Sequence, residues 1–295
     1  MRVFFRKALS RVYRKLEGEL HVQGSSARFA YAFYATNNIY AVAVMVAAHA
    51  LMRLEGRNDV DFVVLHHGVD CFILRRLREL GVFTKQVRPA PFAAEGYFVD
   101  SLTKLRVLQL TQYETVVFMD ADCLPLKRVD ELFAGQWPGS IAASVAYWFP
   151  EKAASTALFA FRPSADLWAR VSRHFASARA RQLFDMDIIN LEFAGEMAWL
   201  PDEYFCLNSE YGDRSRPCYF GAPDASYELV RVVHFSDLGK PWFHRPHLVR
   251  EMRPNAYPQF YRAWQEWWQL RDQVVAGGSL EDRMLYGLLE NLSKR

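Results

Sequence analysis

Cysteine pairs and glycine-rich nucleotide motifs are missing from this sequence of 295 residues. Its four cysteines, Cys71, Cys123, Cys206 and Cys218, form no Cys-x-x-Cys pair. Scattered cysteines of this kind argue against a disulfide framework and favour a reducing compartment, so we expect a cytoplasmic protein. The sequence also has no Gly-x-Gly-x-x-Gly fingerprint, which argues against a Rossmann-type dinucleotide site.

Strong net charge is also absent. The formal net charge of +3 is too small to indicate a nucleic-acid-binding protein. With 51% hydrophobic and 23% charged residues, the chain has the composition of an ordinary folded protein. Its length allows one large α/β domain or two small ones.

The first fifteen residues interleave basic with apolar side chains, and no acidic residue precedes Glu17. The interleaved charges leave no unbroken apolar stretch, which argues against a cleaved signal peptide or a membrane span. Three interpretations remain: a solvated tail or core-covering helix, a helix on a membrane surface, or an organellar targeting segment. We treat residues 1–24 as a separate basic segment, in which residues 1–16 would make any membrane contact.

The remaining apolar segments alternate between strand and helix patterns, which predicts an α/β protein. Strands are predicted at residues 27–35, 59–65, 83–87, 141–148, 156–161 and 229–235. Helices are predicted at residues 41–54, 71–80, 101–112, 129–133, 164–175 and 280–292, and one more begins near Asp185. Asn38 and Asp185 are the expected N-caps of their helices. An aromatic stripe from Tyr257 to Trp268 is predicted to pack against the rest of the protein.

One further strand runs directly into two carboxylates. Five apolar or β-branched residues, 115–119, precede Asp120, Ala121 and Asp122. Such a run is typical of a buried parallel strand, and open α/β sheets bind ligands at the carboxyl ends of these strands. Residues i and i+2 of an extended segment share a face and Ala121 adds no bulk, so both acids can bind one hard cation. The alternative is that Asp120 caps a helix and Asp122 starts a turn.

A second informative stretch follows the last predicted strand and contains His234, Gly239 and Lys240. Imidazole is an accepted ligand of Mn²⁺, and a lysine six residues later could reach a diphosphate as a point charge. A histidine after a strand is usually structural, but the sequence Gly-Lys-Pro-Trp favours a functional site here. Lys104 lies on the helix predicted at 101–112, where spacing alone favours solvent exposure.

These stretches resemble the glycogenin-like family 8 glycosyltransferases over residues 28–245. The segment from Leu102 to Asp122 is the most specific part, because the resemblance extends over its whole length rather than a short motif. The other similar positions are Thr36-Asn37-Asn38-Ile39-Tyr40, Leu132-Phe133, Leu200-Pro201, Asn208, His234-Phe235 and Lys240-Pro241-Trp242.

The resemblance implies a GT-A fold, which is a Rossmann-like mixed sheet flanked by helices. Residues 25–250 would form the catalytic domain, and residues 251–295 a C-terminal helical extension packed on it. The resemblance also implies Mn²⁺, with Mg²⁺ as the alternative, and a retaining transfer of a hexose to a hydroxyl acceptor. The donor would be UDP-glucose, UDP-galactose or UDP-GlcNAc, and the acceptor a carbohydrate or a protein. A homodimer is a further hypothesis.

The resemblance assigns site residues by matching position. Asp120, Asp122 and His234 would bind the metal, and Lys240 would hold the diphosphate. The donor-binding group would comprise Thr36, Asn37, Tyr40, Lys104, Asp120, Ala121, Asp122, Gly239 and Lys240. The catalytic group would comprise Asp185, which positions the sugar or acceptor, Lys104 beside the donor sugar, and Met186.

The chain departs from the family on the sugar and acceptor side. Met186 stands where relatives commonly have a glutamine facing the reacting carbon, and residues 155–157 replace a segment with Asn and Gly. Asp237 replaces the glycine three residues after the metal histidine, a place that Gly239 could fill. These changes leave UDP and metal binding expected but leave the sugar and the turnover open.

Three other functions fit parts of the sequence. A haloacid-dehalogenase-type phosphatase also has Asp-x-Asp after an apolar strand, but this chain contains no later Asp-Asp pair. A nucleotide-sugar-binding scaffold without transfer activity is favoured by Met186. A self-glucosylating primer would need an acceptor tyrosine on a surface loop, for which Tyr211, Tyr219 and Tyr227 are the candidates.

Overall fold

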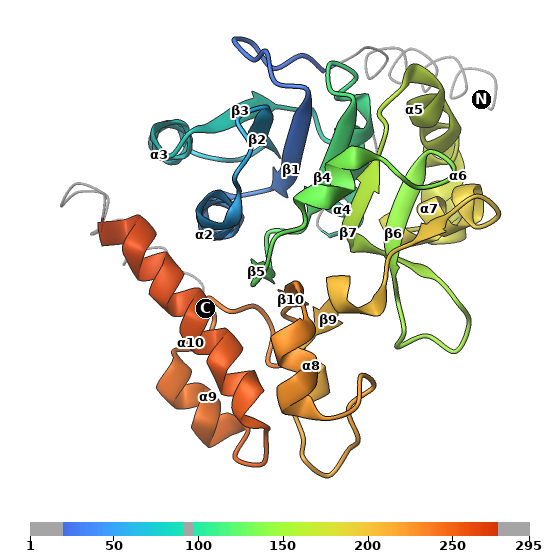
Figure 1. Ribbon diagram of the computed structural model, residues 1–295. Helices are drawn as coiled ribbons and strands as arrows, with labels where there is room; N and C mark the ends of the chain where they lie inside the picture. Colours follow the sequence, from blue (N-terminus) through green and yellow to red (C-terminus); the bar gives the residue numbers. More distant parts are fainter. Residues whose placement is uncertain (1–19, 91–96, 277–295) are drawn as a thin grey trace.

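The structure is a computed structural model that describes residues 20–90 and 97–276. A seven-stranded sheet lies at its centre, with the strand order β3-β2-β1-β4-β7-β6-β8 (Figure 1). Strands β3, β2, β1 and β4 are parallel, whereas β7 is antiparallel to β4 and β6, so the sheet is mixed. The strands are β1 Phe29–Ala35, β2 Val60–His66, β3 Val82–Gln86, β4 Thr115–Met119, β6 Ile141–Val145, β7 Ala154–Phe161 and β8 Ala198–Trp199.

A smaller three-stranded sheet, in the order β5-β10-β9, follows the carboxyl end of β4 (Figure 1). Its strands are β5 Cys123–Pro125, β9 Cys206–Leu207 and β10 Val232–His234. The α-helices are α2 Asn38–Leu54, α3 Cys71–Glu79, α4 Tyr97–Lys104, α5 Ala165–Ser172, α6 Phe175–Arg181, α7 Asp185–Phe193, α8 Pro223–Leu229, α9 Pro246–Met252 and α10 Pro258–Ala276. The 3₁₀ helices are η1 Leu105–Gln109, η2 Asp130–Ala134, η3 Asp202–Tyr204 and η4 Asn208–Tyr211.

Apolar cores cover both faces of the large sheet, which explains why its central strands are apolar along their length. All seven residues of β1 are buried. Tyr31 and Phe33 belong to one core, together with residues of α2, α3 and α10. Ala32 and Tyr34 belong to the other core, together with residues of α4, η1, α5 and α7. The predicted α/β architecture is confirmed.

Two predicted helix caps are wrong. Asn37, not Asn38, caps α2, because its Oδ1 accepts from the backbone N–H groups of Ile39 (3.0 Å) and Tyr40 (3.1 Å). Asp185 is the first helical residue of α7, and Phe184 occupies the N-cap position. The side chain of Asp185 is therefore free of a capping role.

Several predicted element ends also differ. The helix predicted at 101–112 becomes a 3₁₀ helix after Lys104, and the helix predicted at 164–175 ends at Ser172. The strand predicted at 141–148 ends at Val145, so Trp148 lies in the turn before β7. The strand predicted at 229–235 is shorter, because α8 extends to Leu229. Contacts between distant segments override local propensity at these ends.

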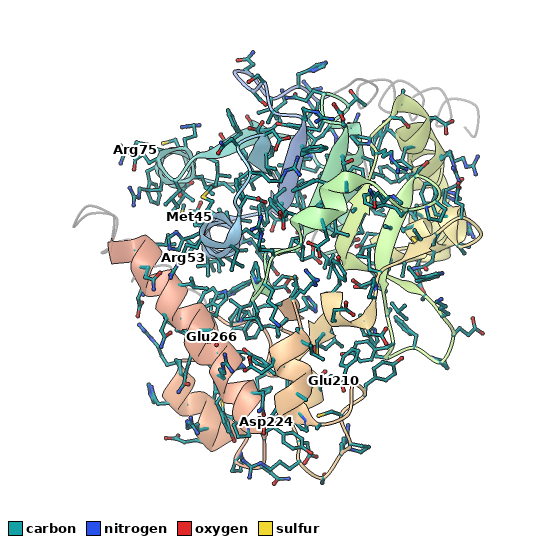
Figure 2. All side chains as sticks on the ribbon, viewed as in Figure 1. Met45, Arg53, Arg75, Glu210, Asp224 and Glu266 are labelled. Carbon is teal, nitrogen blue, oxygen red and sulfur yellow. The ribbon has the colours of Figure 1, made fainter. Side chains whose placement is uncertain are left out.

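The predicted aromatic stripe packs inward from α10, where Trp264 and Trp267 are fully buried. The rings of Trp264 and Phe235 make an edge contact with centroids 5.3 Å apart. The indole N–H of Trp268 donates to the Pro241 carbonyl oxygen at 3.1 Å. Figure 2 shows the side chains between α10 and the rest of the protein. The stripe thus supports the segment that connects β10 to α9.

None of the helices within residues 20–90 and 97–276 is long and apolar enough to cross a membrane. The basic segment at residues 1–16 and the helix predicted at 280–292 lie outside the described residues. The proposed division into segments 1–24, 25–250 and 251–295 therefore stays a prediction.

Candidate active site

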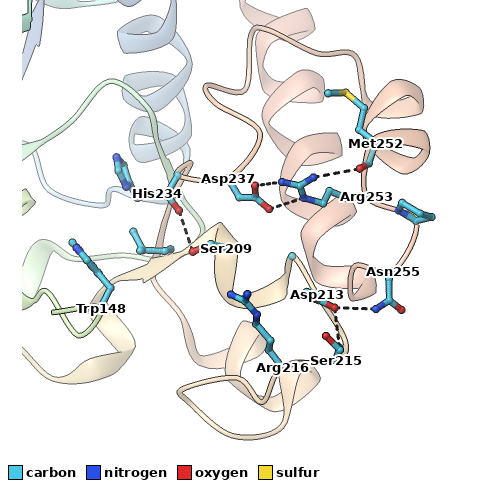
Figure 3. A pocket seen from close by; sticks show the side chains of 14 residues that line it. Trp148, Ser209, Asp213, Ser215, Arg216, His234, Asp237, Met252, Arg253 and Asn255 are labelled. Atoms are coloured by element: carbon cyan, nitrogen blue, oxygen red, sulfur yellow. Dashed lines mark hydrogen bonds and ion pairs between the residues drawn. The ribbon is translucent and has the colours of Figure 1, made fainter. Parts of the chain in front are cut away.

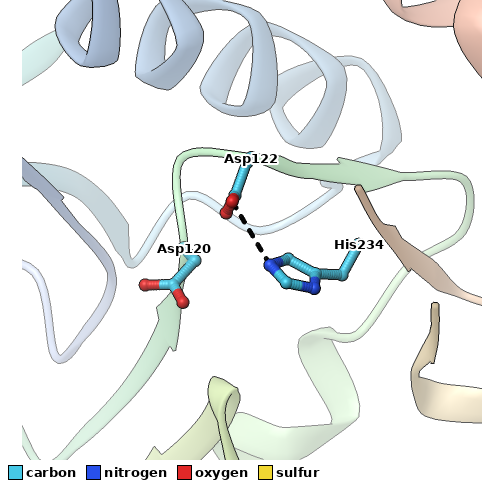
Figure 4. A group of neighbouring side chains, drawn as sticks. All are labelled: Asp120, Asp122 and His234. Atoms are coloured by element: carbon cyan, nitrogen blue, oxygen red, sulfur yellow. Dashed lines mark ion pairs between the residues drawn. The ribbon is translucent and has the colours of Figure 1, made fainter. Parts of the chain in front are cut away.

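The two carboxylates of Asp-x-Asp lie where β4 ends. The backbone N–H of Asp120 donates to the Ala157 carbonyl at 2.9 Å, and the N–H of Cys123 donates to the Asp120 carbonyl at 3.1 Å. This turn leads into β5, which pairs with β10 so that Cys123 stands opposite His234. The register brings His234 beside Asp122, although more than a hundred positions separate them in the sequence (Figure 4).

Asp120, Asp122 and His234 each offer one ligand atom, and these atoms lie within 4.8 Å of one another. His234 Nε2 is 3.3 Å from Asp122 Oδ2, while its buried Nδ1 has no hydrogen-bond partner among the described residues. Neither carboxylate caps a helix, since a strand follows them. Two carboxylates and one imidazole are donors suited to Mn²⁺ and similar divalent cations, so these residues fit a metal ion.

Two lysines lie against the acids. Lys104 Nζ is 3.2 Å from Asp120 Oδ1 and 2.6 Å from Asp185 Oδ2, and its side chain is only 10% exposed. Lys240 Nζ forms an ion pair with Asp122. The expectation that Lys104 faces solvent is wrong, because two carboxylates offset the cost of removing its ammonium group from water.

The pKa shifts of these groups follow from burial and from the neighbouring charges. Burial would lower the pKa of Lys104, but Asp120 and Asp185 raise it above its usual value. Burial would raise the pKa of Asp122, but the charge of His234 helps to hold it well below its ordinary range. Burial raises the pKa of Asp120, which the charge of Lys104 opposes only in part. Lys104 is therefore a fixed cation rather than a general base.

Asp185 and Met186 begin α7 at the same place. Asp185 is buried, and its Oδ2 accepts a hydrogen bond from Thr156 Oγ1 at 2.5 Å. Asn190 anchors α7 to β7, because its Oδ1 accepts from the Ala154 N–H at 2.7 Å and its Nδ2 donates to the Ala154 carbonyl at 3.0 Å. This anchor fixes the first turn of α7 beside the two aspartates.

The turn after β1 contributes Thr36, Asn37 and Tyr40. Because Asn37 Oδ1 already caps α2, only its Nδ2 remains for a ligand, and that atom is 3.4 Å from Thr36 Oγ1. The ring of Tyr40 makes an edge contact with Trp242, with centroids 5.2 Å apart. The turn is thus packed against the segment that carries Lys240.

One cavity of about 350 Å³ brings these groups together. Every predicted site residue except Gly239 lines it: Thr36, Asn37, Tyr40, Lys104, Asp120, Ala121, Asp122, Asp185, Met186, His234 and Lys240. The structure therefore places residues from five separate parts of the chain around one concave space, which we call the donor cavity. Their roles in binding and catalysis stay predictions.

Comparison with curated proteins finds relatives of two kinds. Glucose N-acetyltransferase 1 from Gibberella zeae is 27% identical over 241 residues, which cover 73% of this chain and 53% of the relative. Glycogenin-1 from Mus musculus is 29% identical over 143 residues, which cover 48% of this chain and 41% of the relative. The sequence is therefore similar to the glycogenin-like family 8 glycosyltransferases. It spans about half the length of these curated relatives, and no protein-family model matches it.

Solved glycosyltransferase structures share the fold of this chain. The WbbM bifunctional glycosyltransferase matches with a TM-score of 0.59 and 18% identity, covering 84% of this chain and 53% of that one. The galactosyltransferase LgtC, in complex with donor and acceptor sugar analogs, matches with a TM-score of 0.54 and 17% identity, covering 79% and 99%. At these identities the likeness concerns the fold alone, and it confirms the predicted GT-A fold.

Gly239 shapes the backbone instead of lining the donor cavity. Its φ is +74°, and a Cβ there would lie 2.9 Å from the ring of Phe243. Leu238 before it also has a positive φ, of 59°. Glycine is the residue that such a turn favours, and the turn presents Lys240 to Asp122.

The structure adds lining residues that the sequence did not predict, among them Tyr34, Asp100, Ser101 and Trp148. Tyr34 and Asp100 are both positioned by His67, whose Nε2 lies 2.7 Å from Tyr34 Oη and 3.2 Å from Asp100 Oδ1. A signal for Asp100 was available, because it precedes Lys104 by four positions and so shares its helix face. Trp148 gave no such signal, since the turn that carries it was predicted as a strand.

Proposed function

We propose that this protein is a metal-dependent, retaining hexosyltransferase that moves a hexose from a UDP-sugar to a hydroxyl acceptor. The observation that carries the proposal is the meeting of Asp120, Asp122 and His234 in one cavity with Lys104 and Lys240. The family relationship supports it, since the curated relatives include glycogenin. Mn²⁺ is the proposed cation, with Mg²⁺ as the alternative.

The predicted metal ligands and Lys240 would form the side of the donor cavity that binds the diphosphate. A divalent cation there would offset the negative charge that develops on UDP as it departs. Asp120, Asp122 and His234 would hold the cation. Lys240 would exchange its ion pair with Asp122 for a contact with the diphosphate, while the turn of Gly239 keeps the ammonium group in reach.

The sugar side would be Asp185, Lys104 and Met186. Asp185 accepts from Thr156 and Lys104, so its carboxylate is held in one orientation and can accept a hydroxyl of the donor sugar. Its negative charge would also stabilise the cationic sugar. For retention, the acceptor oxygen would bond to the anomeric carbon on the face from which UDP departs. The departing diphosphate would take the acceptor proton.

The first test measures metal-dependent release of UDP from UDP-glucose, UDP-galactose and UDP-GlcNAc. We expect release with one of these donors in the presence of Mn²⁺, and loss of that release with EDTA. The variant Asp122→Ala should lower release by at least about 10³-fold, because it removes a metal ligand and the partner of Lys240. Initial rates of UDP formation check this prediction.

The control is Asp166→Ala, which removes an exposed acid in the first turn of α5, outside the donor cavity. It should release UDP at the rate of the unchanged protein. If Asp122→Ala keeps its activity, the metal assignment is wrong.

A non-catalytic scaffold is the first alternative, and the place of Met186 in the donor cavity favours it. A thioether offers no strong hydrogen bond to the reacting sugar. Titration with UDP and Mn²⁺ separates the two functions when it is paired with the release assay. A scaffold would bind UDP and release none from any UDP-sugar.

A self-glucosylating primer is the second alternative, and the exposure of Tyr219 favours it. Tyr211 is buried with its hydroxyl 3.1 Å from Ser226 Oγ, and Tyr227 is buried with its hydroxyl 3.2 Å from Glu266. Tyr219 is 56% exposed, so it is the remaining candidate acceptor of the three. Intact mass after incubation with UDP-glucose tests this alternative, and an unchanged mass would end it.

Three predictions about membrane contact, oligomeric state and cellular location rest on the sequence alone. Membrane-surface contact through residues 1–16, a homodimer and a cytoplasmic location are proposals of this kind. Vesicle flotation of the full chain and its mass in solution would test the first two.

A further inference from the structure

A second, larger cavity of about 910 Å³ adjoins the donor cavity. Trp148 and His234 line both cavities, so the two spaces meet at the predicted metal group. The larger cavity lies between the β6–β7 turn, the segment after β9 and the segment after α9 (Figure 3). No residue predicted to bind the donor lies in the segment after β9 or in the segment after α9.

Trp148 lines this second cavity, and further exposed aromatic rings lie next to it in the chain or through Tyr147. Trp148 is 39% exposed, and the neighbouring Phe149 and Tyr219 are 49% and 56% exposed. Tyr147 supports them, since its ring stacks on Tyr219 at 4.6 Å and meets Trp148 edge-on at 5.3 Å. Rings held rigidly at a surface offer a large contact area at low entropic cost. Flat apolar faces of pyranose rings are a chemical match for them.

Polar side chains line the remainder of the cavity. Arg253 makes a bidentate ion pair with Asp237, with distances of 2.6 and 3.0 Å. Asp213 Oδ1 accepts from the Ser215 N–H and from Asn255 Nδ2, both at 2.9 Å. These groups are fixed in place by one another, and their remaining donors and acceptors suit hydroxyl groups.

Arg216 is the exception among these polar groups. Its side chain is exposed and makes no hydrogen bond or ion pair with any residue in the described ranges. Figure 3 shows its guanidinium group directed toward the middle of the cavity. Its charge interacts with that of Asp213. Because no hydrogen bond joins the two side chains, the five N–H donors of the guanidinium are available to a ligand rich in oxygen.

The charges of the lining distinguish among oxygen-rich ligands. Two carboxylates, Asp213 and Asp237, face two guanidinium groups, Arg216 and Arg253. An anionic ligand would meet the two acids, and a cationic ligand would meet the two arginines. A balanced lining favours a neutral ligand that uses hydrogen bonds.

We infer that the second cavity binds the acceptor and that the acceptor is a neutral oligosaccharide, with one pyranose against Trp148 and hydroxyls within reach of Arg216. This inference rests on the proposed transferase function. The sugar unit that lies against Trp148 would present a hydroxyl group toward the donor cavity. That oxygen would form the bond to the donor sugar, the bond from the sugar to UDP would break, and the proton would leave with UDP.

The test measures binding of neutral oligosaccharides by titration calorimetry in the presence of UDP and Mn²⁺. The probes are malto-, cello- and chito-oligosaccharides of one to four units, an oligogalacturonate as the anionic counterpart, and one neutral probe carrying an alkyl chain. We expect at least one neutral series to bind, with affinity rising beyond a single unit because the cavity exceeds one sugar. The alkyl chain should change the affinity by less than about threefold.

Two variants locate the binding. Arg216→Ala and Trp148→Ala should each weaken oligosaccharide binding by about tenfold, and Trp148→Phe should restore most of it because a ring remains. Arg75→Ala removes an arginine on α3, outside both cavities, and should leave oligosaccharide binding unchanged. Arg216 lines only the second cavity, so UDP affinity of Arg216→Ala should stay within twofold.

The outcomes separate this inference from the proposed function. Release of UDP from a UDP-sugar without binding of any neutral oligosaccharide would overturn the acceptor inference and leave the transferase proposal intact. Binding only of the anionic or only of the alkylated probe would also overturn it. Neutral binding that Arg216→Ala and Trp148→Ala leave unchanged would place the acceptor elsewhere. Oligosaccharide binding without turnover of any donor would instead count against the transferase proposal.

Discussion

Two side chains compete for one carboxylate at the centre of the site. Lys240 Nζ and His234 Nε2 both approach Asp122 Oδ2. A divalent cation that binds Asp122 would take the place of the Lys240 ammonium group. Lys240 is therefore a counter-ion of Asp122 in this structure, and on the proposed function it would become available to a diphosphate when a cation binds.

We predict that Lys240→Ala changes metal and nucleotide binding in opposite directions. Affinity for Mn²⁺ without UDP should rise, because the cation no longer displaces an ion pair. Affinity for UDP in saturating Mn²⁺ should fall by about 10- to 100-fold, since a charge-assisted contact is lost. Titration calorimetry with each ligand measures both effects.

The matched control is Lys152→Ala, which removes an exposed lysine that lies over the Trp199 ring at 4.2 Å. It should change neither affinity. A parallel fall of both affinities in Lys240→Ala would mean that Lys240 supports the metal site instead of competing with the metal.

At the scale of elements, α7 is held near its C-terminal end. Asn190 ties it to β7, and Glu192 binds the α5 region through Arg170 Nε (3.0 Å), Arg173 (2.6 Å) and His174 Nε2 (2.8 Å). Burial opposes ionisation of Glu192, but these partners lower its pKa to about 2. Because α7 begins at Asp185, this cluster also fixes one end of the donor cavity.

The shifted pKa predicts how stability depends on pH. Since the folded-state pKa of Glu192 is about 2 against an ordinary 4.5, its ionised form stabilises the fold. The contribution, up to about 3 kcal/mol, is fully present above the ordinary pKa and is lost as pH falls toward the shifted one. In Glu192→Gln the free energy of unfolding should be lower at neutral pH and should depend less on pH over this window. Urea unfolding at a series of pH values measures it.

Glu196→Gln serves as the control, because Glu196 contacts Arg170 but has a 40% exposed side chain. Its loss should cost less than about 1 kcal/mol at neutral pH. Equal losses for the two variants would show that the cluster around Glu192 adds nothing specific.

At the scale of the whole molecule, the site joins the large sheet to the small one. Asp120 follows a strand of the large sheet, His234 ends a strand of the small sheet, and α10 supports the segment between β10 and α9. A ligand that bridges these parts would oppose their separation on unfolding. Binding should therefore raise the stability of the whole chain.

We predict that Mn²⁺ with UDP raises the melting temperature. At ligand concentrations about a hundredfold above Kd the gain is about 2.7 kcal/mol, which corresponds to roughly 5 °C for a chain of this size. EDTA should abolish the shift, and Asp122→Ala should show none. Differential scanning calorimetry measures it, and an equal shift in Asp122→Ala would place the binding elsewhere.

The amino-acid sequence by itself determined the features that a few neighbouring residues encode. The apolar run before Asp120, the polar turn at residues 36–40 and the aromatic periodicity of α10 each follow from local pattern and propensity. They predicted the α/β class, the location of the two carboxylates and the inward face of α10. Errors at this level were small, such as the exchange of Asn38 for Asn37 as the cap of α2.

Only the tertiary structure decided which distant groups meet. The pairing of β5 with β10 brings His234 to Asp122, and the burial of Lys104 depends on acids from β4 and α7. The turn that places Trp148 between two cavities is likewise set by where β6 stops pairing. Contacts of this kind depend on the balance of desolvation and charge among segments far apart in the chain, and no local pattern carries that balance.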